Sequence, residues 1–276
     1  RLADTWEYDI DNDWWTQRAD MPGTVRNAAT GFSVGSKGYV TTGYNPVHKY
    51  LSDTWEYNPE TNSWRQMDDF KGGARYYALG FGIDNYGYVG TGYNDNYLKD
   101  FYRFDPTAAA GSQWTIVNGF GGQKRQGGTA FVIDGKAYVC GGQNNNSDVS
   151  DFWCFDPSAA TPWTQLRDIA NTSDDDYDDD YTSIVRSYGV SFVIDGKAYL
   201  TLGSTAGGSY YSNYWIYDPA TDLWEGDDLT AFEGSTRIHA VCFSTGTRGI
   251  VATGGSGSSS YFDDTWELKP YEYEEE

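Results

Sequence analysis

Residues 125–163 read RQGGTAFVIDGKAYVCGGQNNNSDVSDFWCFDPSAATPW, and the same order of features recurs along the chain about every 50 residues. An arginine opens a stretch that ends in phenylalanine, and an Asp-Gly turn leads to a hydrophobic stretch that ends in glycine. A third stretch begins with aspartate and carries aromatic residues at every second position, and a tryptophan follows after an Asp-Pro turn. Short alternating stretches between turn residues predict four β-strands per repeat, which we name A to D.

The four strand types do not occur equally often. Strand A occurs five times, and its copies begin at Arg26, Arg75, Arg125, Arg186 and Arg237. Strand B also occurs five times, with terminal glycines at Gly43, Gly92, Gly142, Gly203 and Gly254. Strand C occurs six times, with central aromatic residues at Trp6, Trp55, Tyr102, Trp153, Trp215 and Trp266. Strand D occurs five times, with tryptophans at Trp15, Trp64, Trp114, Trp163 and Trp224.

This order of strands resembles the kelch repeat over essentially the whole chain. The Gly-Gly pair typical of kelch repeats is intact only at Gly141-Gly142 and Gly254-Gly255, so the repeat is degenerate. The resemblance implies an all-β propeller of four-stranded blades, an arrangement that buries both faces of each sheet and leaves only short edges. Within strand A the third and fifth residues after the arginine are small and the sixth is phenylalanine, which predicts that neighbouring blades pack closely along this strand.

The strand count predicts six blades in one propeller domain spanning residues 1–276. Six blades need six strands of each type, so one D, one A and one B strand would be missing. We expect a stretch of about 45 residues before residue 1 to supply them. The alternative is a five-bladed propeller with a spare strand C. The predicted parts are a partial blade 1–22, blades 23–70, 71–122 and 123–169, an acidic insert 170–184, a blade 185–232, a partial blade 233–270 and an acidic tail 271–276.

The composition narrows the classes of partner. The chain has 276 residues, a formal net charge of −21 and 17% aromatic residues. Such a charge disfavours non-specific binding to nucleic acid or to anionic membranes. No run approaches the roughly 18 apolar residues of a membrane span. We expect an exported protein, periplasmic or at the cell surface, because degenerate kelch chains rich in Asn, Tyr and Trp resemble bacterial proteins of those compartments. A signal or lipid-anchor segment is expected upstream.

The kelch resemblance also locates a binding site. In that fold the start of strand A and the loop between strands B and C open on the same mouth of the central channel. The expected ligand-binding residues there are Arg26, Arg75, Arg125, Arg186, Arg237, Tyr77, Tyr188 and His239. Guanidinium groups recognise carboxylate, sulfate or phosphate, whereas Asn, Tyr and Gly in the loops suit a glycan or a peptide. The alternative is that the arginines are structural and bridge carbonyl or carboxylate groups between strands.

The sequence gives less support to calcium binding, copper chemistry or a disulfide bridge. The segment Asp174–Asp180 could offer oxygen ligands to Ca²⁺, but a solvated loop is the preferred interpretation. His48 and His239 are the two histidines and belong to different blades, so the copper chemistry of the galactose oxidase family is excluded and no cofactor is expected. Cys140 and Cys154 lie on neighbouring strands, where buried thiols are favoured over a bridge.

The expected function is therefore non-catalytic binding of a carbohydrate or protein at the arginine-lined mouth. The alternative is an acidic-sugar mutarotase or epimerase resembling the N-acetylneuraminate mutarotases. That reaction needs an acid-base pair, for which His239 beside Arg237 is the candidate.

Overall fold

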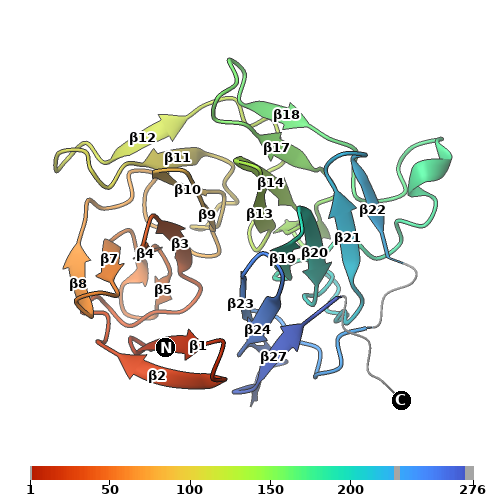
Figure 1. The fold of residues 1–276 in the computed structure, drawn as a ribbon. Helices are drawn as coiled ribbons and strands as arrows, with labels where there is room; N and C mark the ends of the chain where they lie inside the picture. Colours follow the sequence, from red (N-terminus) through yellow and green to blue (C-terminus); the bar gives the residue numbers. More distant parts are fainter. Residues whose placement is uncertain (1, 227–230, 271–276) are drawn as a thin grey trace. The chain divides into compact units, whose positions relative to one another are not determined.

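The computed structural model describes residues 2–226 and 231–270, so the acidic tail predicted at 271–276 lies outside the described residues. The chain divides into two compact units, Arg1–Phe120 and Gly121–Glu276. Both are built from antiparallel β-strands, which Figure 1 colours along the sequence. No helix among the described residues is long and apolar enough to cross a membrane.

The first unit contains a hairpin and two four-stranded blades. The hairpin pairs β1 (Thr5–Asp9) with β2 (Trp14–Arg18). The first blade has the order β3 (Thr30–Val34), β4 (Lys37–Thr41), β7 (Thr54–Asn58) and β8 (Ser63–Gln66). The second has the order β9 (Leu79–Ile83), β10 (Tyr86–Gly90), β11 (Phe101–Phe104) and β12 (Trp114–Val117).

The second unit contains three blades. The third blade of the chain has the order β13 (Thr129–Ile133), β14 (Lys136–Cys140), β17 (Trp153–Phe155) and β18 (Trp163–Gln165). The fourth has the order β19 (Val190–Ile194), β20 (Lys197–Thr201), β21 (Trp215–Asp218) and β22 (Leu223–Glu225). Within the described residues, which end at position 270, the fifth has three strands, β23 (Val241–Ser244), β24 (Gly249–Ala252) and β27 (Thr265–Leu268).

The prediction of six blades is wrong, because residues 2–226 and 231–270 form five. The count of strand C copies was the misleading signal. The first copy, β1, pairs with β2 alone in a two-stranded sheet, and no A–B pair among the described residues joins it. The five-bladed alternative with a spare strand C describes the structure, and the inference of three missing strands loses its basis.

Turn chemistry and alternating burial explain why each repeat folds as it does. Asp134 and Gly135 both take positive φ, 49° and 72°, which is the tight turn that joins twisted strands most readily. In β13, Thr129, Phe131 and Ile133 are buried while the residues between them keep some exposure. The strands β3, β9, β13 and β19 therefore each carry one buried row of side chains, whereas β23 of the fifth blade has no buried residue.

Strand A packs against the next blade as the small-residue pattern predicts. In the first unit, Phe32 of β3 makes edge contacts with Phe104 and Trp114 of the second blade, at centroid distances of 5.9 and 6.4 Å. A Cβ atom added at Gly80 would collide with the Thr30 side chain, and one at Gly87 would collide with the Phe32 ring. Glycine at these positions is therefore a packing requirement between blades.

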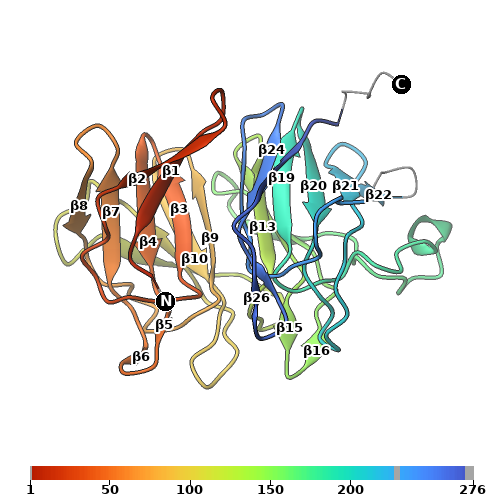
Figure 2. The ribbon, with the colours of Figure 1, turned by 90° about the horizontal axis from the view of Figure 1, so that it is seen from below.

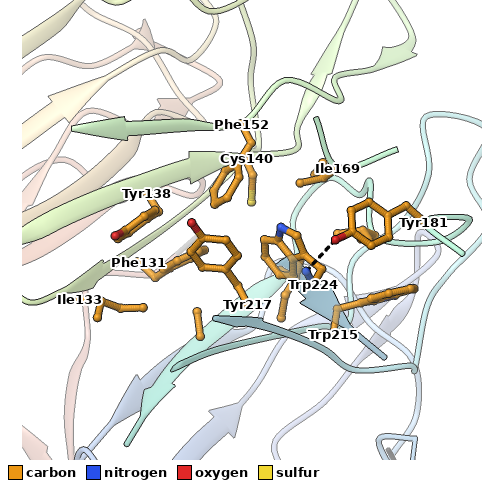
Figure 3. Packing of buried hydrophobic residues seen from close by; sticks show 13 residues of the cluster. Phe131, Ile133, Tyr138, Cys140, Phe152, Ile169, Tyr181, Trp215, Tyr217 and Trp224 are labelled. Atoms are coloured by element: carbon orange, nitrogen blue, oxygen red, sulfur yellow. Dashed lines mark hydrogen bonds between the residues drawn. The ribbon is translucent and has the colours of Figure 1, made fainter. Parts of the chain in front are cut away.

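The largest buried cluster joins the third and fourth blades of the second unit (Figure 3). The Tyr217 ring lies 5.3 Å from Tyr138 and 4.8 Å from Phe152, measured between centroids. Tyr181 of the acidic insert joins this cluster, and its hydroxyl accepts a hydrogen bond of 2.7 Å from the Trp224 backbone N–H. The insert is thus anchored in the core by Tyr181.

The insert contains a short 3₁₀ turn, Asp176–Asp178. The Asp178 carboxylate is buried and accepts hydrogen bonds of 2.9 Å from the backbone N–H groups of Thr172 and Ser173. These bonds lower the pKa of Asp178 against the opposing effect of desolvation. Residues 170–184 therefore do not form a wholly solvated loop. All three cysteines are free thiols, so Cys140 and Cys154 are not bridged.

Candidate ligand-binding face

The five arginines that open the A strands are buried, with exposed fractions between 0 and 6%. In each blade, the arginine Nη1 donates to the carbonyl oxygen of the residue before the strand B glycine, at 2.9–3.1 Å. The acceptors are the carbonyl oxygens of Thr42, Thr91, Gly141, Leu202 and Thr253. Each arginine thereby ties the start of strand A to the end of strand B.

Four of these arginines also pair with the aspartate that opens strand C. The pairs are Arg26–Asp53, Arg75–Asp100, Arg125–Asp151 and Arg237–Asp264. In three of these blades the same carboxylate accepts a hydrogen bond from a tryptophan Nε1 two residues later, at 2.6 Å for Trp55, 3.2 Å for Trp153 and 2.7 Å for Trp266. In each of these four blades, the buried arginine therefore holds strand C to strands A and B.

The fourth blade departs from this arrangement. Asn213 stands where the other blades have aspartate, and Arg186 Nη2 donates to its Oδ1 at 3.1 Å. Ser183 Oγ receives the Trp215 Nε1 hydrogen bond, at 3.2 Å, and that of Asn213 Nδ2, at 2.6 Å. Arg186 thus lies buried among neutral acceptors, with the Tyr211 ring 4.7 Å from its guanidinium carbon, and desolvation lowers its pKa to about 10.

This geometry supports the structural interpretation of the arginines. The five N–H donors of Arg186 face five protein oxygen contacts, from Ser183, Ile184, Leu202 and twice from Asn213. The guanidinium groups of the other four blades engage carbonyl and carboxylate oxygens in the same way. That any arginine contacts a ligand stays a prediction.

The residue two positions after each arginine takes a left-handed backbone conformation. These residues are Ala28, Tyr77, Gly127, Tyr188 and His239, with φ between 53° and 62°. Because all five blades share it, the conformation belongs to the scaffold and does not by itself mark a site. It allows neighbouring blades to bond: Tyr77 N–H donates to the Ala28 carbonyl oxygen at 3.0 Å, and Tyr188 N–H donates to that of Gly127 at 2.7 Å.

Two of the predicted site residues meet in the second unit. The Tyr188 and His239 rings lie 4.5 Å apart between centroids at an interplanar angle of 67°. The Tyr188 hydroxyl accepts hydrogen bonds from Gln126 Nε2 at 2.9 Å and from Gln143 Nε2 at 2.7 Å. His239 keeps accessible surface, and desolvation by the surrounding protein lowers its pKa, which favours neutral imidazole near pH 7.

The third predicted aromatic residue, Tyr77, lies in the first unit among five more tyrosines. We call this set the tyrosine cluster; it consists of Tyr44, Tyr50, Tyr76, Tyr77, Tyr93 and Tyr97. Tyr76 is central, with ring centroids at 5.6 Å from Tyr44, 5.7 Å from Tyr50, 4.6 Å from Tyr77 and 5.8 Å from Tyr93. Tyr77 is the one member of the cluster among the residues predicted from the sequence, and the other five are not among them. For four of these five the signal was a tyrosine directly after the strand B glycine, at Tyr44 and Tyr93, and another near the end of each loop, at Tyr50 and Tyr97.

The loops between strands B and C have a common anchor. In all five blades, the residue after the arginine and the residue after the strand B glycine exchange two backbone hydrogen bonds of 2.8–3.1 Å. Three loops form short hairpins: β5 (Tyr44–Asn45) with β6 (Lys49–Tyr50), β15 (Gln143–Asn144) with β16 (Ser147–Asp148), and β25 (Gly255–Ser256) with β26 (Ser260–Tyr261). In the second unit, β15, β16 and β26 extend from the same end of the blades (Figure 2).

The described residues contain no group of three or more His, Cys, Asp or Glu side chains that could hold a metal ion. The buried carboxylate of the acidic insert, Asp178, is occupied by hydrogen bonds from Thr172 and Ser173. Calcium binding at Asp174–Asp180 stays a prediction without support from this geometry.

Comparison with known proteins agrees with the fold. The family model described as the Kelch motif matches residues 26–71 and 124–166. A solved structure titled "Structure of YjhT" superposes with a TM-score of 0.80 at 15% sequence identity, covering 98% of this chain and 89% of that chain. No curated protein matches the sequence. Together with the arginine-led A strands and the A-to-D strand order, these findings identify a β-propeller that carries kelch motifs at residues 26–71 and 124–166.

Proposed function

We propose that this chain is a non-catalytic binding propeller that holds a carbohydrate on its B-to-C loops. The observation that carries the proposal is the anchoring of these loops. Five loops of different sequence start from the same pair of reciprocal backbone hydrogen bonds, next to a buried arginine. Variable loops on a rigid, repeated base are the usual site of ligand specificity.

The composition of the loops suits binding. They are rich in Tyr, Asn, Ser and Gly, as in Tyr93-Asn-Asp-Asn-Tyr97 and Gly255-Ser-Gly-Ser-Ser-Ser-Tyr261. Tyrosine supplies a large contact area with few rotatable bonds, while Asn, Ser and Gly supply adaptable hydrogen bonds, the mixture found in antibody paratopes. Sugars present both apolar C–H faces and hydroxyl groups, so such loops offer a partner for each.

A glycan array tests the proposal. The protein, labelled at its C-terminus, should bind a subset of the oligosaccharides printed on the array. Replacing loop residues 45–49 and 94–96 by Gly-Ser linkers should change or abolish binding to that subset. A folded protein that binds no oligosaccharide on the array contradicts the carbohydrate proposal. It would favour a protein ligand, the other class predicted from the sequence.

A second candidate is mutarotation of an acidic sugar, which the Tyr188–His239 contact favours. The buried arginines weaken this candidate, since their guanidinium donors already face protein oxygens. Exchange NMR on sialic acid anomers tests it: acceleration by the wild type that is lost in His239→Ala would support catalysis.

We also propose an exported location, periplasmic or at the cell surface, as the sequence predicts. Fractionation of cells that produce the natural full-length protein tests this, and recovery in the cytoplasmic fraction would contradict it.

A further inference from the structure

We propose that the tyrosine cluster of the first unit is the main carbohydrate subsite and that it takes an uncharged glycan. This inference rests on the proposed function, and it adds the place of the site and the chemical class of the ligand.

The cluster joins two loops and one strand start. Tyr44 and Tyr50 face each other across the β5–β6 hairpin, and Tyr93 bridges Tyr97 within the loop of the second blade. The Tyr50 hydroxyl donates to Asp95 Oδ1 at 2.7 Å, which ties the first loop to the second. Desolvation, together with this bond, raises the pKa of Tyr50, so the phenol stays neutral and keeps donating. The rings are thus held in place before any ligand arrives.

The cluster is unlike the aromatic cores between blades. All six tyrosines keep partial exposure, whereas the aromatic residues that fill the blade interfaces, such as Phe104 and Trp114, are buried. Aromatic rings that are ordered yet accessible provide flat apolar surface for the C–H face of a sugar, and their hydroxyl groups provide polar contacts at the rim. Asn27, whose backbone bonds to that of Tyr44, and Asn96, which precedes Tyr97 in the loop, are both exposed and offer amide donors and acceptors.

Charge distinguishes an uncharged glycan from an acidic one. The two arginines nearest in sequence, Arg26 and Arg75, are buried and paired with Asp53 and Asp100, so neither offers a free fork to a carboxylate or sulfate. Asp95 is exposed on the loop and the chain carries a net charge of −21, both of which repel an anion. Lys49, exposed on β6, is the cation next to Tyr50.

The test measures the affinities of neutral, sialylated, sulfated and uronate-containing oligosaccharides by array and then by calorimetry with the best neutral probe. Tyr97→Ala and Tyr93→Ala should each weaken binding of that probe about ten-fold or more, as central aromatic contacts do. Trp14→Ala removes an aromatic residue from the β1–β2 hairpin, outside the B-to-C loops, where it is 61% exposed, and should leave affinity unchanged.

The outcomes separate the inference from the proposed function. If neutral glycans bind but Tyr93→Ala and Tyr97→Ala bind as well as wild type, the site lies elsewhere and only this inference fails. If sialylated or sulfated probes bind more tightly than neutral ones and Lys49→Ala weakens their binding, the assignment of an uncharged glycan as the ligand is overturned. If no glycan binds to the folded wild type, both the proposed function and the inference about the tyrosine cluster fail. Circular dichroism of each variant checks folding, and Tyr93→Phe, which keeps the ring, should retain most of the affinity.

Discussion

Replacing Asp151 with alanine should destabilise the second unit strongly. Arg125 is fully buried, and the Asp151 side chain that pairs with it is 9% exposed. Removing the carboxylate would leave Arg125 charged and buried without its counterion, a change that costs about 3–5 kcal/mol in comparable buried pairs. The Gln123 backbone N–H and Trp153 Nε1 would also lose their acceptor.

The fourth blade gives this experiment an internal reference. There Asn213 replaces the aspartate and still accepts from Arg186, so Asp151→Asn should cost less than Asp151→Ala, about 1–3 kcal/mol. Glu7→Gln is the control for charge alone, because the Glu7–Arg18 pair is exposed and should contribute at most about 1 kcal/mol.

Urea unfolding followed by tryptophan fluorescence and circular dichroism measures these differences in unfolding free energy. The expected order of destabilisation is Asp151→Ala, then Asp151→Asn, then Glu7→Gln. If Asp151→Ala proves as mild as Glu7→Gln, the buried arginine–aspartate pairs do not hold the blades together, and the structural role assigned to them is refuted.

Three further predictions concern the same framework. Asn213→Asp should give Arg186 a counterion and raise the unfolding free energy by about 1 kcal/mol, read by urea titration; destabilisation would show that Ser183 and Asn213 already compensate the charge. The hydrogen bonds from Arg237 lower the pKa of Asp264 to about 2, and those from Arg26 and Trp55 lower that of Asp53 against desolvation. The ionised carboxylates stabilise the folded state above their unfolded pKa near 4, so the unfolding free energy should fall as the pH drops from about 4 toward 2. A urea midpoint that stays constant over that pH range would contradict a stabilising role of these arginine–aspartate pairs. Gly127→Ala should destabilise by about 1–3 kcal/mol more than Gly135→Ala, since both glycines have positive φ but only a Cβ at Gly127 collides with the Tyr188 ring; equal thermal melting temperatures would contradict this.

The sequence predicted the strands because each copy repeats the same local chemistry. Period-two burial, Asp-Gly turns and the terminal glycines are local features, and the structure places a strand at each A, B and C copy. The number of blades is not local. It depends on which strand pairs with which, and the Asp4-Thr-Trp6 copy carries the same residues as a blade strand while it pairs with β2 alone.

The site shows a similar division. Tyr188 and His239 were both expected at the channel mouth because the kelch resemblance places the start of strand A there. The structure brings their rings into contact, which the sequence did not predict. The tyrosine cluster was missed because its members come from two loops and one strand start, and their proximity depends on how the β5–β6 hairpin leans toward Asp95. For the arginines, the sequence left a ligand-binding and a structural role open, because it does not show that the strand C aspartates meet them.

A crystal structure of the protein soaked with the best neutral oligosaccharide from the array tests the central claim most directly. We expect a sugar ring stacked on Tyr76, Tyr93 or Tyr97 of the first unit, with Arg26 and Arg75 still bonded to Asp53 and Asp100. A sugar bound to a freed arginine side chain, or held by Tyr188 and His239 with the tyrosine cluster empty, would contradict it.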